Sequence, residues 1–233
     1  MLRIKWYGHS AFELVDGDTR ILIDPWLSNP LSPTHPSRYN ERVDLIVLTH
    51  GHDDHIGDAV ELLRRNPESK LAAIYELALH MQTRLGEQGG EANRFIGGNI
   101  GGPMQIPGLG RKVALTPAVH SSPIGAPTGA LVFTGEGVVY HAGDTGLFSE
   151  MSLIGELYEP LVALLPIGGH FTMDELQAAK AVEMLKPKYV IPMHYNTFPV
   201  IQADPERFRA LVEKRAPGVK VVVLKPGEEL RIG

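Results

Sequence analysis

Three histidines and an aspartate fall within six positions directly after an apolar segment, and this run limits what the chain can fold into. The segment 44–48 (DLIVL) is typical of a strand buried on both faces, and His50, His52, Asp54 and His55 follow it. In extended backbone, side chains two residues apart point to the same side, so His50 and His52 can reach one ion. Asp54 and His55 lie where the chain turns into a helix and can reach a second ion nearby. Because zinc and related cations bind imidazole and carboxylate groups, the run predicts a metal site.

The alternative is a polar loop that carries incidental histidines. Histidine is an infrequent residue, and only 10 occur in the 233-residue chain. Three of them beside a well-placed aspartate, at the end of a buried strand, favour the metal site over the polar loop.

Composition restricts the class of protein. With 233 residues, 43% of them hydrophobic, the chain can bury a substantial core, and one domain over 1–233 is expected. The net charge of −5 argues against a nucleic-acid partner, which requires a basic face. The absence of cysteine excludes disulfides, a thiolate nucleophile and cysteine-bound zinc. Neither a signal peptide nor a long apolar run is visible, so we expect a cytoplasmic protein with no membrane partner.

The order of expected elements favours a layered α/β fold. Strand patterns cover 2–7, 11–15, 20–23 and 44–48, and a proline-rich loop over 24–42 is expected to shape a pocket. Residues 86–110 read as glycine-rich and weakly structured, and Thr172 opens a capping box before a helix. Later strands and helices alternate up to a closing strand over 229–232. Two sheets covered by helices fit this pattern, while a single doubly wound sheet stays open on the pattern alone.

The site sequence resembles a known family. His50-x-His52-x-Asp54-His55 matches the H-x-H-x-D-H signature of the metallo-β-lactamase superfamily residue for residue. The rest of that pattern follows in the same order, with single ligand-type residues after later apolar segments, at His120, Asp144 and His194. The resemblance covers nearly the whole chain.

This resemblance implies a fold and a ligand set. The fold would be α/β (α+β), a four-layer αββα sandwich of two mixed sheets flanked by helices. Asp24 would accept a hydrogen bond from the second ring nitrogen of a metal-binding imidazole and so orient that ring. The expected cofactors are two divalent cations, with zinc first and manganese second. One ion would be held by His50, His52 and His120, the other by Asp54, His55 and His194, and Asp144 would bridge them.

The implied chemistry is hydrolysis. A hydroxide bridging two cations would attack an ester, lactone or phosphodiester bond of a small molecule, and Asp54 would orient it as a catalytic residue. The alternatives are a metal-dependent nuclease, or a binding or sensing module without turnover. Because no cysteine can act as a ligand, cleavage of β-lactams is not the expected task. The chain could also form a homo-oligomer.

Weaker candidates lie outside this ligand set. Gly8-His9-Ser10, the segment 99–102 and the segment 166–173 resemble a little-characterised bacterial and archaeal branch of metal-dependent hydrolases. That branch is similar to L-ascorbate-6-phosphate lactonase and to N-acyl-phosphatidylethanolamine phospholipase D. His9 is therefore a candidate catalytic residue at the pocket edge, where it would bind substrate or stabilise the oxyanion, and His170 is a candidate for a catalytic role at the metal rim. A surface or turn histidine is the alternative for each, and the role of Asn99 stays open. His141 reads as an interior histidine.

Overall fold

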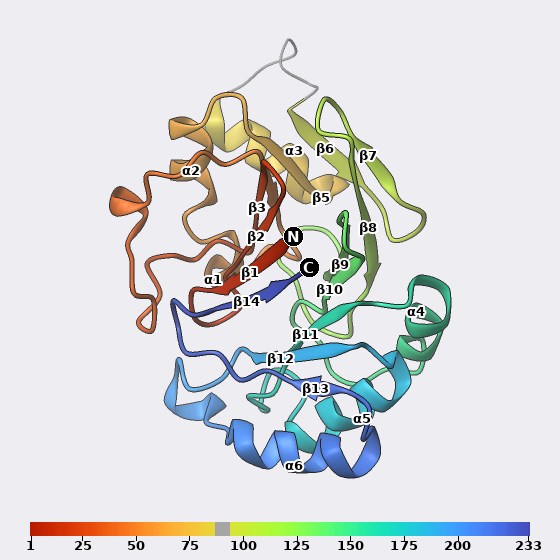
Figure 1. The fold of residues 1–233 in the computed structure, drawn as a ribbon. Helices are drawn as coiled ribbons and strands as arrows, with labels where there is room; N and C mark the ends of the chain where they lie inside the picture. The colour runs from red at the N-terminus through yellow and green to blue at the C-terminus, as the bar shows by residue number, and fades with distance from the viewer. Residues whose placement is uncertain (87–93) are drawn as a thin grey trace.

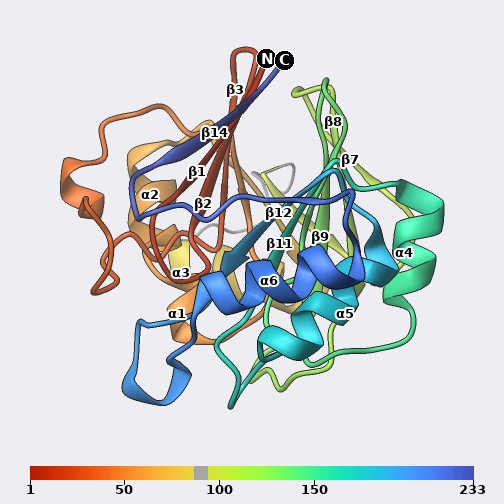
Figure 2. The ribbon, with the colours of Figure 1, turned by 60° about the horizontal axis from the view of Figure 1, so that its bottom comes forward.

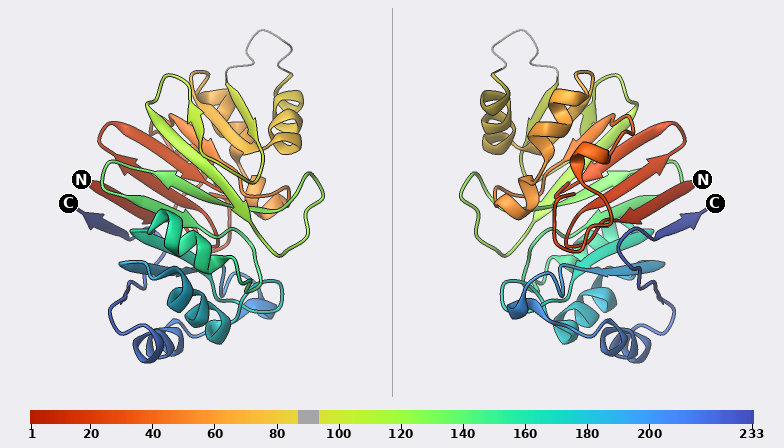
Figure 3. Two further views of the ribbon diagram at one scale, coloured as in Figure 1. Left: turned by 90° about the vertical axis from the view of Figure 1, so that its right-hand side faces the viewer. Right: turned by 90° about the vertical axis from the view of Figure 1, so that its left-hand side faces the viewer.

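Two mixed β-sheets of seven strands each pack face to face, with helices on their outer surfaces (Figure 1). The computed structural model describes residues 1–86 and 94–233. In Figure 3 the strands lie between the yellow α3 at one end and the blue α6 at the other. This is the four-layer arrangement that the resemblance implies, and it excludes the single doubly wound sheet.

The first sheet has the strand order β14-β1-β2-β3-β4-β5-β6. The strands from β14 to β3 pair antiparallel, and those from β3 to β6 pair parallel. Its strands are β1 (Leu2–Trp6), β2 (Phe12–Asp16), β3 (Thr19–Ile23), β4 (Leu45–Val47), β5 (Lys70–Ile74), β6 (Phe95–Gly98) and β14 (Glu229–Ile232).

The second sheet repeats this division, in the order β13-β12-β11-β10-β9-β8-β7. The strands from β7 to β10 pair antiparallel, and those from β10 to β13 pair parallel. Its strands are β7 (Met104–Ile106), β8 (Arg111–Pro117), β9 (Thr128–Phe133), β10 (Val138–His141), β11 (Val162–Pro166), β12 (Tyr189–Met193) and β13 (Lys220–Val221).

Helices cover the outer face of each sheet. α2 (Ala59–Arg65) and α3 (Tyr75–Leu85) lie against the parallel half of the first sheet, and the short α1 (Asp53–Ile56) precedes them. α4 (Met151–Tyr158), α5 (Glu175–Leu185) and α6 (Pro205–Arg215) cover the second sheet, as Figure 2 shows. Two 3₁₀ turns, η1 (Pro36–Arg38) and η2 (Pro199–Ile201), lie in loops. Among the described residues, no helix is long and apolar enough to cross a membrane.

The burial of β4 explains the apolar segment before the histidines. Leu45 and Val47 belong to the core between the two sheets, whereas Ile46 and Leu48 belong to the apolar cluster beneath α1–α3. Because both faces of the strand are covered, the segment carries no polar alternation. The turn that carries the candidate ligands therefore begins at the end of a strand that is packed on both faces.

Two local predictions were wrong. Residues 87–93 of the segment 86–110 lie outside the described residues, and the rest of that segment contains β6 and β7, because pairing with β5 and β8 holds these short strands, whose sequences carry little strand pattern. The helix after β11 is capped by Asp174, not Thr172: the Asp174 carboxylate accepts a hydrogen bond from the Gln177 N–H at 2.8 Å. α3 ends at Gly86, which adopts φ 75° and caps the helix.

The contact between α4 and α5 yields a test of this packing. A β-carbon at Gly155 in α4 would lie 2.7 Å from the Met184 carbonyl oxygen and 2.8 Å from that of Leu185. We expect Gly155→Ala to lower the free energy of unfolding by about 1–3 kcal/mol through overpacking, measured by urea denaturation. Gly218→Ala, where the added carbon meets open space, is the control. Equal midpoints for the two variants would show that the helices can move apart freely.

Candidate metal centre

The candidate ligands meet at one edge of the two sheets, where several strands end. His50, His52, Asp54 and His55 follow β4 of the first sheet. His120, Asp144 and His194 follow β8, β10 and β12 of the second sheet. The strand ends of both sheets therefore supply the site, and neither sheet could build it alone.

Three overlapping groups of side chains each place their ligand atoms within 4.8 Å of one another. Every residue expected as a metal ligand belongs to at least one of them. The groups are His50, His52 and His120; His50, His55 and Asp144; and His9, Asp54, His55 and His194.

Asp144 lies at the centre of the cluster. Its Oδ1 is 3.3 Å from the Nε2 of His55, and its Oδ2 is 3.1 Å from that of His194 and 3.6 Å from that of His120. Burial raises the pKa of the Asp144 carboxyl, but His194 and His55 outweigh burial and hold it well below its usual range. Asp144 therefore stays ionised and can bind a cation from either oxygen.

Asp24 fixes the orientation of two of the imidazoles. Its fully buried carboxylate accepts a hydrogen bond from the His55 Nδ1–H at 2.7 Å and from the Thr49 hydroxyl at 2.6 Å. Because the Thr49 hydroxyl donates to Asp24, its oxygen accepts from the His50 Nδ1–H, at 3.0 Å. Both histidines are thus left with Nε2 facing the cluster. Asp24 makes the contact with a ligand imidazole that the sequence predicts.

These contacts test whether a metal fits. The Nε2 of His55, Oδ1 of Asp144 and both ring nitrogens of His194 are buried without a hydrogen bond. The Nε2 of His50, left with a lone pair, faces the Nδ1 of His52 at 2.9 Å. The Nε2 atoms of His55 and His194 lie 3.3 and 3.1 Å from Asp144 without a well-directed hydrogen bond, and a cation between these nitrogens and oxygens would satisfy them. Imidazole and carboxylate donors without thiolate fit zinc or manganese.

His9 lies deeper than the sequence suggested. Its ring is fully buried and does not line the cavity, so it is not at the pocket edge. The Nε2 lies 3.0 Å from Oδ2 of Asp54, and the Nδ1 lies 2.9 Å from the Thr197 hydroxyl. Burial, together with the neighbouring His194, lowers the pKa of His9 to about 4. A neutral ring with both nitrogens occupied can position Asp54 and has no free nitrogen to offer a substrate.

The open space beside the cluster is a cavity of about 270 Å³. Sequence reasoning missed three of its walls, Ser121, Phe171 and Phe198, although two of them follow predicted ligands closely in the chain. His170 does not line the cavity: it is exposed and its ring lies 4.3 Å from that of Phe171, which does. Asn99 is also exposed and outside the lining. The lining residues are His52, Asp54, His120, Ser121, Asp144, Phe171, His194 and Phe198.

His141 is a satisfied interior histidine, as its sequence context suggests. It is fully buried, its Nδ1 accepts a hydrogen bond from the Gly143 N–H at 3.1 Å, and its Nε2–H donates to the Ser10 carbonyl at 2.9 Å. With both nitrogens used, it has none to offer a metal.

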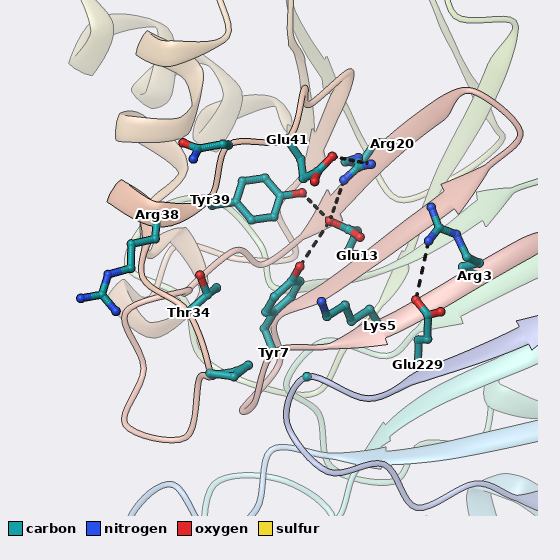
Figure 4. Close-up of a pocket in the computed structure, with 13 residues that line it drawn as sticks. Arg3, Lys5, Tyr7, Glu13, Arg20, Thr34, Arg38, Tyr39, Glu41 and Glu229 are labelled. Carbon is teal, nitrogen blue, oxygen red and sulfur yellow. Dashed lines mark hydrogen bonds and ion pairs between the residues drawn. The ribbon is translucent and has the colours of Figure 1, made fainter.

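A larger cavity, of about 760 Å³, lies on the outer face of the first sheet (Figure 4). At its floor, the Glu13 carboxylate accepts hydrogen bonds from the hydroxyls of Tyr7 and Tyr39 and lies 3.4 Å from the Arg20 guanidinium. Tyr39 belongs to the proline-rich loop, so this network fastens the loop to β2. The cavity has no histidine in its lining, and its carboxylates are paired with tyrosine or arginine side chains. We assign it a structural role.

The comparisons with known proteins agree with this geometry. The model of the Beta-lactamase superfamily domain matches residues 19–195. A UPF0173 metal-dependent hydrolase from Hyperthermus butylicus is 58% identical over 97% of this chain and 97% of its own length. The chain belongs to the UPF0173 metal-dependent hydrolase family of the metallo-β-lactamase superfamily.

Solved structures of related proteins fit this assignment. Igni18, described as a novel metallo hydrolase from the hyperthermophilic archaeon Ignicoccus hospitalis, has 51% sequence identity and a TM-score of 0.89, covering 98% of this chain and 97% of its own. YhfI from Bacillus subtilis, a metallo-β-lactamase fold protein, has 14% identity and a TM-score of 0.73 over 99% of this chain and 100% of its own. The second likeness shows the fold alone.

The charge around His55 yields a pH prediction. Burial lowers the pKa of His55, but Asp144 and Asp24 outweigh burial and raise it well above 6.5. The metal-free protein therefore holds a proton on His55 at neutral pH, and a cation must displace it. We expect the apparent zinc affinity to increase from about pH 6 to 8, with net proton release, because metals bind the neutral imidazole.

Calorimetry in two buffers of different ionisation enthalpy measures that release. Asp24→Asn removes one of the carboxylates that raise the pKa of His55, so the variant should release fewer protons on binding zinc. Zinc binding by the wild type without proton uptake by the buffer would contradict the assigned charge state of His55.

Proposed function

We propose that this chain is a dinuclear metal-dependent hydrolase of small molecules. The observation that carries the proposal is the group of buried imidazole nitrogens around Asp144 that lack hydrogen bonds and lie beside an open cavity. His50, His52 and His120 would hold one cation, Asp54, His55 and His194 the second, and Asp144 both. Two zinc ions, or manganese as a second choice, would acidify a water molecule and polarise the substrate oxygen.

We assign proton transfer to Asp54. Its carboxylate lines the cavity, and its side chain is 28% exposed. Burial raises the pKa of Asp54, but the hydrogen bond from His9 and the charge of His55 lower it below its usual range. An ionised Asp54 can accept a hydrogen bond from the attacking water and pass the proton on to the leaving group.

His9 is a positioning residue in this proposal rather than a ligand. It belongs to a group with Asp54, His55 and His194, but both of its ring nitrogens have other partners. Because Asp54 is ionised, His9 donates to it from Nε2, and its Nδ1 accepts from the Thr197 hydroxyl. His9 thereby fixes the rotamer of Asp54 at the edge of the cavity.

Two alternatives are less well supported. A nuclease needs cationic side chains for the phosphate backbone, and the cavity lining includes neither lysine nor arginine. A binding or sensing module would keep the metal but show no turnover. Metal-loaded protein that hydrolyses generic esters, with the activity lost in Asp54→Ala, would separate an enzyme from a binder. From the sequence likeness to the lactonase of ascorbate 6-phosphate, we propose only that a lactone is among the bonds this chain cleaves.

The first experiment is elemental analysis of the purified full chain, before and after loading with zinc or manganese. We expect about two divalent ions per chain in the wild type and clearly fewer in His52→Ala, with loss of turnover. His80→Ala on α3, a histidine outside the site, is the matched control and should retain both ions. A wild type that binds no metal after loading would refute the dinuclear centre.

Changes at His9 test the positioning role. We expect His9→Gln to lower kcat or metal affinity by about 10- to 100-fold, the usual effect of removing a residue that orients a metal ligand. Thr197→Val, which removes only the hydroxyl, should change the same quantity in the same direction by a smaller factor. If His9→Gln leaves kcat and zinc affinity unchanged, Asp54 does not depend on His9 for its orientation.

A further inference from the structure

The described residues that line the metal cavity carry no permanent positive charge. The eight lining residues include two carboxylates, Asp54 and Asp144, but no lysine and no arginine. Proteins that recognise phosphate or carboxylate groups usually place arginine or lysine against them. An anionic group on the substrate, away from the reacting bond, would therefore find no lysine or arginine on these walls.

Two phenylalanines, Phe171 and Phe198, form the apolar part of the wall. Phe198 stacks on Trp26, with ring centroids 6.0 Å apart and an interplanar angle of 27°, and its ring lies at 72° to that of the buried His9. Phe171 lines the same cavity with 53% of its surface exposed. The wall at Phe198 is thus held in place by its neighbours, while Phe171 contacts the exposed His170 ring and presents about half of its surface to solvent.

Two further exposed apolar residues lie close to lining residues in the chain. Val119 precedes the candidate ligand His120 and is 57% exposed, and Val200 follows Phe198 in η2 and is 54% exposed. Exposed apolar side chains that gather around a concave site mark a surface for an apolar ligand. A volume of about 270 Å³ suits the reacting group and a short chain or one ring.

From these observations we propose that the substrate is an uncharged carboxylic ester or lactone whose acyl side carries an apolar group, and not a phosphorylated molecule. This inference rests on the proposed function and narrows it. The water oxygen bonds to the carbonyl carbon, and the C–O bond to the alcohol breaks. One water proton passes through Asp54 to the departing oxygen, which leaves a carboxylic acid and an alcohol.

The test compares substrates that differ only in the far end of the acyl chain. Zinc-loaded full-length protein is given p-nitrophenyl acetate, p-nitrophenyl hexanoate and the mono-p-nitrophenyl ester of adipic acid. Hexanoate and adipate share their leaving group and chain length, but adipate ends in a carboxylate. We expect kcat/KM to increase by up to about fourfold for each methylene that is buried, and to fall at least tenfold from hexanoate to adipate.

Variants of exposed apolar residues test which side chain is responsible for the preference for a longer acyl chain. Phe171→Ala removes an exposed side chain and should lower the ratio of kcat/KM for hexanoate over acetate. Leu157→Ala, which removes a 69% exposed leucine from α4, is the control and should leave that ratio unchanged. The inference would be overturned if the adipate ester were hydrolysed with the same kcat/KM as the hexanoate ester. It would also be overturned if Phe171→Ala left the ratio of kcat/KM for hexanoate over acetate unchanged. Either result would leave the proposal of a metal-dependent hydrolase intact. Metal-verified protein that turns over none of the esters would overturn both.

Discussion

The buried carboxylate of Asp24 sets the chemistry of the site. A charge without solvent must be paired, and Asp24 is paired by the His55 ring and by the backbone and side chain of Thr49. Through Thr49 it also orients His50. The fully buried carboxylate of Asp24 thus determines that His50 and His55 both turn their Nε2 atoms toward the cluster. Asp144 then faces the Nε2 of His55 on a ring whose orientation is already set, and the other candidate ligands lie around it.

The sequence predicted the parts of the molecule that depend on local pattern. The candidate ligands follow apolar strands, so the ends of β4 and β12 could be placed from periodicity, and their order matched a known signature. Predictions were wrong where pairing with segments distant in sequence determines the secondary structure. β6 and β7 are strands because β5 and β8 pair with them. The walls formed by Phe171 and Phe198 and the burial of His9 depend on how loops fold over the site, which a single sequence does not reveal.

Strained backbone gathers at this edge of the sheets. His9, Asp24 and His194 all have positive φ angles, of 51°, 45° and 55°. Residues other than glycine rarely adopt this conformation, and they keep it only where surrounding contacts hold them. The carbonyl of His9 accepts hydrogen bonds from the Trp6 indole and from the backbone N–H of His194. The turns that carry these residues therefore hold one another in place, which explains how a site made of loops can be well defined.

The origin of the ligands has a consequence for the integrity of the fold. Four candidate ligands follow β4 in the first sheet, and three follow strands of the second, with up to 144 positions between them in the chain. Cations held there would act as cross-links between the two halves of the sandwich, in a protein that has no cysteine to form any other. A ligand that binds only the folded chain stabilises it, and one that joins distant segments also restricts the chain as it opens. The same ions would then both take part in the reaction and hold the two sheets together.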